Sequence, residues 1–448
     1  MSDLLNIGAS GVRAYQTALT TVSENIANVG TAGYSKRTTD LSEVMGGGGA
    51  VTQRITLDGN GVLATGVSRA ADQLKSANVR SASTDLSRSE TGIAWLGRIQ
   101  TALTGNQLTD RLTGFFTATT SVAADPTATT PRAAMIEAAG SVANAFSATG
   151  KALDSVASDL DATAQDAVNN LSSLGAALAK VNDGLGRATA GTSGAAQLLD
   201  QRDQILEQVS AISDIAVSTD AAGRATVNLG GSGGPVLVAG GVSGDVTYAR
   251  GTTGAVAFAV RRGGTSTGFA PSGGVLAGVV DGATRIQSAQ EGLDAVASAF
   301  TGGVNAAQAG GRDLDGNPGA PLFTVGADPS DMALSLTDPR GIAAASVGGG
   351  QRDNSNLQAF AAVRASGASE SRTTQLVTDN AAALAARQQV ADAQSAIRDG
   401  AVVTRDSVSG VNLDNEAVDL MRFQQAYSAS SRIIQVARET FQSILDIH

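Results

Sequence analysis

The sequence of 448 residues contains no cysteine and a single histidine, His448. Disulfides and thiolate chemistry are therefore excluded, and a His-dependent catalytic triad or a histidine metal site is nearly so. Aromatic residues make up only 3% of the chain, whereas glycine occurs 54 times. The cores must then be built mostly from Ala, Val, Leu and Ile, which suits long helices packed closely side by side.

The chain also lacks features of several partner classes. Its formal net charge of −10 argues against nucleic acid, because binding phosphates requires a surface rich in Lys and Arg. No apolar run approaches the roughly 18 residues of a membrane span, so no membrane partner is expected. The start, MSDLLNIGAS, lacks the basic segment and apolar run of a cleaved secretory signal. These features alone predict a cytoplasmic protein.

Two short motifs have the spacing of catalytic loops without their context. GTSTG, which contains Ser266, matches the G-x-S-x-G pattern of a hydrolase nucleophile, but it follows a strand-like hairpin and opens no helix. GGGG, at 46–49, lacks the strand and helix that flank a phosphate-binding loop, so it is interpreted as a flexible linker. We therefore expect no enzyme and no cofactor.

The segment DLDGNPG has some features of a calcium-binding loop. It places Asp313, Asp315 and Asn317 at alternate positions, like the first ligands of a calcium loop. Pro318 stands where that loop needs glycine, and Thr324 stands where a bidentate glutamate belongs. A turn held by side-chain hydrogen bonds is the better interpretation, and no metal site is expected.

The N-terminal segment carries a seven-residue apolar repeat. Such an a/d seam lets one helix pack along another, and Ser2 or Asp3 can cap the start of the helix. The repeat consists of Leu5, Val12, Leu19 and Ile26, each followed three residues later by Gly8, Tyr15, Val22 and Val29.

The C-terminal segment repeats the pattern. Asp414 and Glu416 near its start favour the positive end of a helix dipole. Further apolar residues lie outside the a and d positions of the seam. A single partner helix would leave them exposed to water, so we expect neighbouring subunits to cover them. We also expect Ile434 to lie near Leu19 or Val22. The seam comprises Leu413, Leu420, Tyr427, Ile434 and Phe441 with Phe423, Ala437 and Ile444; the residues off it are Met421, Ile433, Val436 and Ile447.

Between the two terminal segments, the spacing of apolar residues along the sequence changes twice. Residues 85–210 have helical spacing, interrupted at 125–131 (DPTATTP), because the residue before a proline avoids the helical region. From 212 to 269 the period is two, and AVSTDAAGRATVNLG and VTYARGTTGAVAFAV predict hairpins. Residues 275–309 and 371–399 are helical again, with MALSLTD as a short strand between them.

This layout predicts an α+β fold that is mostly α. Its parts are terminal helices paired as a coiled coil, a long helical bundle and an inserted β-rich domain. The expected boundaries are 1–40 with 405–448 for the coiled coil, 41–211 with 340–404 for the helical domain, and 212–339 for the β-rich domain with one long helix.

The segment SENIANVGTAGYSKR, at 23–37, resembles the signature of the bacterial flagellar axial proteins of rod, hook and hook–filament junction. In that family the motif closes the first terminal helix and starts an extended segment. The residues allow this physically, since Asn28 and Gly30 can take left-handed conformations that end a helix, and Gly33 and Tyr34 redirect the chain. The family turn is thus expected at Asn25, Asn28, Gly33 and Tyr34.

The C-terminal segment narrows the resemblance. SGVNLDNEAVDLMRFQQAYSASSRIIQVARETFQSIL is similar to the last helix of the hook-associated protein 1 family, which forms the hook–filament junction. FFTATTSVAADPTATTPRAAMI and VASAFTGGVNAAQAGG are similar to its middle. Many members carry a further β domain after the segment matching PLFTVG; here it is expected to be absent, near 326–331.

The resemblance implies a structural role. Subunits would self-associate into a ring through the two terminal seams, with the hook protein below and a second junction protein above. An export chaperone would bind the C-terminal helix. The protein would leave the cell uncleaved through the flagellar type III route and lie in the extracellular flagellum, which replaces the cytoplasmic expectation.

Three alternatives stay open at this point. A hook or distal rod protein of the same axial family would have a middle dominated by strands, whereas residues 85–210 here are helical. From a different class, a secreted coiled-coil adhesin would carry a secretory signal. A hydrolase that uses Ser266 is the third, and it would lose activity on Ser266→Ala.

Overall fold

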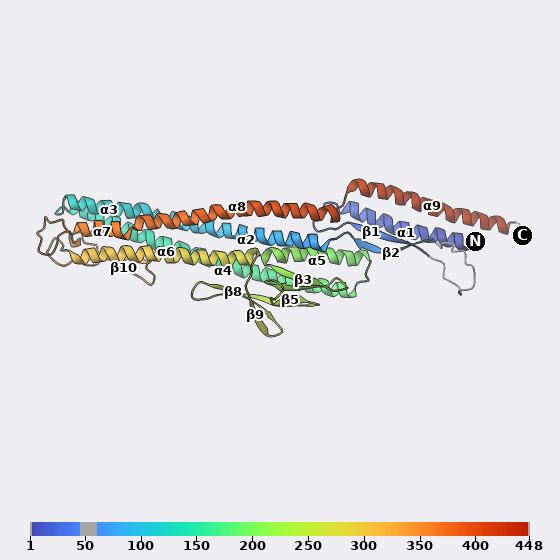
Figure 1. The fold of residues 1–448 in the computed structure, drawn as a ribbon, viewed down its shortest axis with the longest axis horizontal. Coiled ribbons are helices and arrows are strands. Elements are labelled where there is room, and N and C mark those ends of the chain that lie inside the picture. The colour runs from blue at the N-terminus through green and yellow to red at the C-terminus, as the bar shows by residue number, and fades with distance from the viewer. Residues whose placement is uncertain (1, 45–60, 447–448) are drawn as a thin grey trace.

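The computed structural model describes residues 2–44 and 61–446. A long bundle of helices carries a pair of terminal helices at one end and small β-sheets on one side (Figure 1). Both chain ends lie at the far tip of the terminal pair (Figure 1). The GGGG segment at 46–49 and residues Ile447 and His448 lie outside the described residues.

The bundle contains the helices between the two terminal ones. Helix α2 contacts α4, α5, α6 and α8, so it lies at the centre of the packing. It begins after Asp72, whose carboxylate accepts hydrogen bonds from the amides of Leu74 and Lys75. The helices break within the predicted interruption at 125–131, but the gap between α3 and α4 covers only 125–128, since Pro131 lies in the first turn of α4. The bundle helices are α2 (Gln73–Thr104), α3 (Leu108–Ala124), α4 (Thr129–Arg187), α5 (Ser193–Ile212), α6 (Gly274–Gly310), α7 (Leu357–Gly367) and α8 (Ser369–Ser409).

The few aromatic side chains of the bundle are concentrated at one place. Phe115 is fully buried and lies 5.3 to 6.3 Å, between ring centroids, from Phe116, Phe300 and Phe323. Phe146 stacks on Phe300 at 6.1 Å. The cluster joins α3, α4 and α6 to the strand that begins at Phe323, which fixes the end of the bundle away from the termini.

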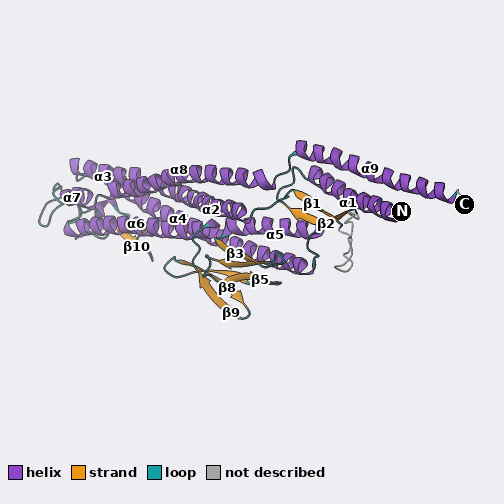
Figure 2. Ribbon diagram, turned by 45° about the vertical axis from the view of Figure 1, so that its right-hand side comes forward, coloured by secondary structure: helices purple, strands orange, loops and turns teal. Residues whose placement is uncertain are grey.

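The β-rich part confirms both predicted hairpins. Val217 pairs with Val227 in the first, and Tyr248 pairs with Phe258 in the second. The sheets hang from the side of the bundle beside α4 and α5 (Figure 2). One sheet has the order β3-β4-β5-β6 and the other the order β7-β8-β9. The strands are β3 (Ile215–Thr219), β4 (Ala225–Leu229), β5 (Val236–Ala239), β6 (Val242–Ser243), β7 (Asp245–Arg250), β8 (Val256–Arg262) and β9 (Thr265–Phe269).

The expected β-rich domain at 212–339 is too long. Its long helix, α6, belongs to the bundle and packs against α2 and α4. The close approach depends on glycine, because a Cβ on Gly278 would stand 2.5 Å from Thr91 and one on Gly282 would stand 2.6 Å from Trp95. These glycines therefore allow α6 to pack closely in the bundle, so α6 is not part of the β-rich domain.

After α6 the chain makes a short antiparallel hairpin of β10 (Phe323–Val325) and β11 (Met332–Leu334), followed by the 3-10 turn η1 (Pro339–Gly341). The segment 326–331, where a further domain is expected to be absent, is the turn of this hairpin. The amide of Gly326 donates to the carbonyl of Asp331 at 2.6 Å, which closes the turn.

The terminal helices form a unit with a two-stranded ribbon. This unit, here called the arm, consists of α1 (Ser2–Ala27), β1 (Arg37–Glu43), β2 (Val62–Arg69) and α9 (Leu413–Leu445). The ribbon lies along α1, where Thr39 Oγ1 donates to Thr21 Oγ1 at 2.9 Å and the amide of Val62 donates to Ser10 Oγ at 3.3 Å. The expected boundary at residue 40 is therefore too early, because the ribbon extends to Arg69.

Candidate functional site

Helices α1 and α9 pack antiparallel along their length (Figures 1 and 2). The contacts run from Gly8 against Ile434, through Gly11 against Ser430, to Tyr15 against Phe423, whose ring centroids are 6.4 Å apart. A Cβ on Gly8 would stand 2.6 Å from Ile434 Cγ1, so the two helices approach as closely as glycine permits. Within the subunit Ile434 thus lies against Gly8. Leu19 and Val22, beside which it is expected in the assembled ring, face the other half of α9 of the same subunit in this antiparallel register.

The buried line of α1 consists mainly of small residues and includes two residues of the predicted seam, Gly8 and Val22. Ala14, Ala18 and Val22 are 1%, 1% and 5% exposed, and Gly8 and Gly11 are buried with them.

The other predicted residues of α1 are less buried. Val12, Tyr15, Leu19 and Ile26 are half-buried, and Leu5 is exposed. Heptad counting missed Gly11, Ala14 and Ala18, although the run of Gly and Ala at helical spacing was their signal.

The predicted seam of α9 faces α1 for most of its length. Leu420, Phe423, Tyr427 and Ile434 are half-buried against α1, while Leu413 and Phe441, at the two ends, are exposed. The side chain of Ile444 lies outside the described residues. Asn412 caps the helix, since its Oδ1 accepts from the amides of Asp414 and Asn415.

The side of α9 away from α1 exposes several apolar side chains interspersed with polar ones. Val418, Met421 and Val436 are 59%, 56% and 58% exposed, and Arg432 lies between the last two on the same side. Val436 follows Tyr427 by about two and a half helical turns, which places it on the side away from α1. The helix therefore packs one face on α1 and carries exposed apolar side chains on the other.

Asn25 ties three parts of the arm together at the base of the helix pair. It is fully buried. Its Nδ2 donates to the carbonyl of Arg37 at 2.8 Å and to Glu416 Oε2 at 2.9 Å. Its Oδ1 accepts from the hydroxyl of Tyr34 at 2.8 Å and from the amide of Arg37 at 3.0 Å. Because an amide side chain has two N–H donors and two acceptor positions, Asn25 is fully satisfied and no other residue type of its size can replace it.

The carboxylate that Asn25 contacts belongs to a buried ion pair. Glu416 of α9 is 1% exposed, and its Oε1 lies 2.9 Å from Lys36 Nζ. The backbone of Lys36 also contacts the end of α8, where its amide donates to the carbonyl of Ser409 at 2.8 Å. The predicted turn residues thus hold α9 as well as closing α1. The sequence assigned Glu416 only to the helix dipole and gave no role to Lys36.

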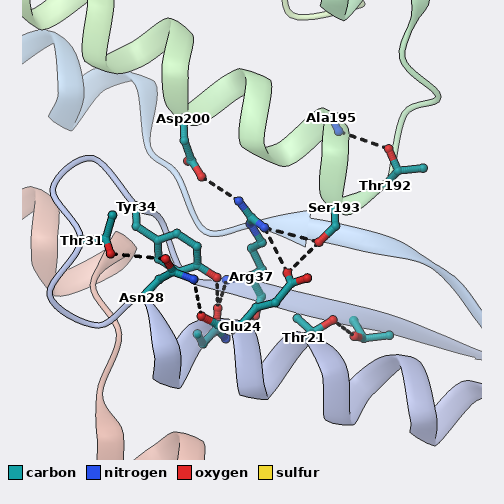
Figure 3. Close-up of polar contacts among 12 residues, drawn as sticks. Thr21, Glu24, Asn28, Thr31, Tyr34, Arg37, Thr192, Ser193, Ala195 and Asp200 are labelled. Carbon is teal, nitrogen blue, oxygen red and sulfur yellow. Dashed lines mark hydrogen bonds and ion pairs between the residues drawn. The ribbon is translucent and has the colours of Figure 1, made fainter.

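The turn lies where the sequence predicts it, but neither Asn28 nor Gly30 takes the left-handed conformation that was expected to end the helix. Asn28 Nδ2 donates to the carbonyl of Glu24 at 2.8 Å, and Thr31 Oγ1 donates to Asn28 Oδ1 at 3.3 Å (Figure 3). Gly33 has a φ of +78°, a left-handed conformation that favours glycine, and it packs on the side chain of Gln204. The turn therefore meets α5 of the bundle.

Arg37 carries the contact from the arm to the bundle. Its guanidinium lies between Glu24 of α1 and Asp200 of α5, at 3.1 Å from each (Figure 3). Ser193 at the start of α5 donates to the same Glu24 carboxylate at 2.7 Å. The guanidinium also lies 4.9 Å from the centre of the Tyr34 ring, a cation–π contact.

Arg69, paired with Arg37 across the ribbon, adds a second contact to α5. It lies 3.2 Å from Asp200 Oδ1 and forms an ion pair with Asp203. Burial raises the pKa of Asp200, while Arg69 and Arg37 act in the opposite direction. The sequence described this part of α5 as an amphipathic helix, and nothing in a single sequence links it to residues more than 100 positions away.

The other candidate motifs show no catalytic arrangement. Ser266 lies on the exposed strand β9, not at a turn into a helix. Asp313 Oδ1 accepts from the amides of Asp315 and Asn317, so the loop forms the expected turn. Within residues 2–44 and 61–446, no group of three or more acidic or histidine side chains is placed to hold a metal ion. No described helix combines the length and apolarity needed to cross a bilayer.

Comparison with known families finds two matches. The family model for the flagellar hook-associated protein FlgK helical domain matches residues 96–323, half of the chain. The family model for the flagellar basal body rod FlgEFG protein C-terminal matches residues 405–447. The first match covers the end of α2, helices α3 to α6 and the two sheets between α5 and α6, and the second covers α9 with the end of α8.

Individual proteins agree with these matches. Flagellar hook-associated protein 1 of Salmonella typhimurium is 28% identical over 358 residues, which are 75% of this chain and 63% of that protein. The protein of the same name in Escherichia coli K12 is 28% identical over 236 residues, or 51% of this chain and 42% of that protein. The chain therefore spans less than two thirds of the length of these relatives. The solved flagellar hook junction protein FlgK from Burkholderia pseudomallei has a similar fold, with a TM-score of 0.51 and 24% identity over 55% of this chain and 46% of that chain.

Proposed function

Because the chain belongs to the flagellar hook-associated protein FlgK family, we propose that it is a structural subunit of the junction between the hook and the filament of the bacterial flagellum. Its role is assembly and not catalysis. Subunits pack side by side through the arm into a ring, with α1 covering one face of α9 and a neighbouring subunit covering the other. The observation that carries this proposal is the exposure of Val418, Met421 and Val436 on the side of α9 away from α1.

The energetics favour such a use of the second face. Burying an exposed Val or Met side chain contributes about 1.5–3 kcal/mol, and three per subunit recur around a closed ring. Lone exposed apolar residues are ordinary on a protein surface, but three on the outer side of a helix whose inner side is already paired are candidates for contact with a neighbouring subunit. The seam residues named from the sequence take part in two ways, those facing α1 within the subunit and those at the ends between subunits.

The remaining assignments rest on the family. The hook protein lies below the ring, a second junction protein lies above it, and an export chaperone binds α9 before assembly. The subunit is exported without cleavage and ends in the extracellular flagellum. For the domains, we propose that the arm forms the ring, the bundle stabilises it laterally and the sheets face outward.

A hook or distal rod protein is the second candidate. The match of residues 405–447 to the rod-protein C-terminal family favours it. Residues 96–323 match the helical domain of the hook-associated family instead. This longer match favours a junction protein over a hook or rod protein.

Replacing Val436 with Asp in cells tests the proposal. The side chain is exposed in the subunit, so folding is unchanged, but a carboxylate at the contact between subunits is costly to bury. We expect hooks without filaments and flagellin released into the medium. The matched control is Gln435→Asp, an exposed polar neighbour, which should assemble normally.

The location of the mutant protein separates two causes of failure. Mutant protein released into the medium but absent from hooks indicates lost packing, whereas retention in the cell indicates a lost chaperone contact. Normal filaments on Val436→Asp cells would contradict the proposal.

A further inference from the structure

The second half of α8, residues 390–409, has its apolar side chains on the outside of the bundle. Val390, Ile397 and Val403 are 46%, 63% and 69% exposed. Its inner side is polar, since Gln394 Oε1 and Arg398 Nε are buried without a hydrogen-bond partner among the described residues. A surface helix normally buries its apolar side and exposes its polar side. The inverted arrangement of α8 is expected where a further surface covers the helix.

The outermost line of this half consists of small residues flanked by carboxylates. Asp392, Asp399 and Asp406 recur every seven residues and are all exposed. The last two contact the preceding arginine of their own helix, yet their side chains are still 64% and 51% exposed. Small side chains let another helix approach closely, and the carboxylates favour a partner that carries Lys or Arg. The small residues are Ala386, Ala393, Ala396 and Gly400.

Helix α4 carries matching charges on the opposite side of the bundle. Both α4 and α8 pack on α2, which lies between them (Figures 1 and 2). Lys180 and Arg187 of α4 are seven residues apart and exposed. Leu178 and Leu185, each two residues earlier and so more than half a turn away, are buried in the core. The two cations therefore lie on the outer side of α4.

The two sets of charges lie at similar levels along the bundle. Helix α2 runs antiparallel to both α4 and α8, so these two run parallel to each other. Arg98 of α2 pairs with Asp159 of α4, and the same turn of α2 bonds to Asn380 of α8, which fixes a common level. From there α8 reaches Asp399 in 19 residues and α4 reaches Lys180 in 21, about 28 Å and about 32 Å. The second charge follows seven residues later on each helix.

We propose that the outer side of α4 of one subunit packs on the outside of α8 of the next subunit in the ring, with Lys180 beside Asp399 and Arg187 beside Asp406. Because the two surfaces lie on opposite sides of one bundle, the contact is head-to-tail, the kind that can close identical subunits into a ring. The inference rests on the proposed function and names the bundle surfaces that meet in the assembly.

The absence of cysteine in the chain makes the test direct. Lys180→Cys and Asp399→Cys, both at exposed positions, are combined in one chain, and intact flagella from these cells are treated with a short bismaleimide. We expect a ladder of covalently joined subunits. Each single variant should stay monomeric, and flagella that contain both single variants in separate chains should give dimers and no longer products, because the contact joins unlike surfaces.

Lys151→Cys combined with Asp399→Cys is the matched control. Lys151 is also exposed on α4 but lies 29 residues from Lys180, about 44 Å along the helix, so no ladder should form. A ladder in this control would overturn the proposed register. Products of Asp399→Cys alone, whether a dimer or an adduct with another protein, would give the surface a different occupant and overturn the contact.

The same cells separate this inference from the proposed function. If the Lys180→Cys and Asp399→Cys chain is present between hook and filament but gives no ladder, the contact between α4 and α8 is wrong and the junction role stands. If the unmodified protein is absent from flagella that carry normal filaments, both are wrong.

Discussion

Ile434 of α9 lies directly over Gly8 of α1, so that a Cβ on the glycine would stand 2.6 Å from Ile434 Cγ1 and 3.3 Å from the carbonyl oxygen of Ser430. The first neighbour is a side chain and can shift, but the second is backbone. The separation of the two helices is therefore set by the missing side chain at residue 8. Any residue larger than glycine there must push α9 away from α1.

Gly8→Ala should accordingly destabilise the arm, although alanine is the better helix former. The matched control is Gly97→Ala in α2, where nothing lies within 4 Å of the new Cβ. The control should gain up to about 1 kcal/mol from helix propensity. At Gly8 an overpacking cost of about 1–3 kcal/mol should outweigh that gain. Hydrogen exchange of α1 and α9 amides measures the effect, and equal protection in both variants would contradict the close contact.

Asn25→Asp should loosen the base of the arm. The change keeps the size, but both donated hydrogen bonds are lost and a second carboxylate faces Glu416. Each buried group left without its partner costs about 1–3 kcal/mol. Hydrogen exchange should show faster opening of α1 and α9 with an unchanged bundle.

Asn182→Asp, outside the arm, is the matched control for Asn25→Asp. Asn182 is also buried, donates to the carbonyls of Ala225 and Gly240, and accepts from the amide of Ala225. Its replacement should open the β3-β4-β5-β6 sheet and leave the arm protected. A result in which Asn25→Asp opens the bundle and arm equally would show that the two are one cooperative unit.

Alkaline pH should weaken the arm through Tyr34. Burial raises the pKa of Tyr34 from 10.0 to about 12, Arg37 lowers it, and the carboxylates of Glu24, Asp200 and Glu416 raise it further. The folded state thus holds the phenol proton more tightly than the unfolded chain. The stability that this adds is complete below about pH 10 and is lost as the pH rises from about 10 to about 12.

Tyr34→Phe checks this sign. The variant should be less stable than the parent at pH 8, because Asn25 Oδ1 loses a donor, and the difference should shrink above pH 10. Urea unfolding of both proteins between pH 8 and 11 measures it. Tyr248 has a pKa raised in the same way to about 12, so Tyr248→Phe should show the same trend in the body of the protein. A difference that stays constant with pH would disprove the role of the Tyr34 proton.

The sequence was sufficient where the signal is local. The pairing of Val217 with Val227 follows from alternation and a turn, and the break between α3 and α4 follows from proline chemistry. The two terminal stripes also predicted that the chain ends pair. Each of these inferences needs only residues that are near one another in the chain.

The sequence was insufficient where partners are distant or small. Arg37 and Asp200 are 163 residues apart, and neither a period nor a motif connects them. The close contact between α1 and α9 continues from Gly8 of the predicted seam through Gly11 and Ala14, which the heptad repeat did not include. Helices approach where side chains are smallest, so the tightest contact is the one with the weakest hydrophobic signal.

The pairing of the two terminal helices has a consequence for the order in which parts of the protein fold. The contact between Asn25 and Glu416 closes a loop of 391 residues, and the conformational entropy of closing a loop rises with its length. A polypeptide is synthesised from its amino end, so α1 has no partner helix until α9 has been completed. The contacts of α3 with α4 and of α4 with α5 span much shorter loops and can form earlier. The arm therefore forms only after α9 has been made, later than the parts of the bundle that precede it in the chain.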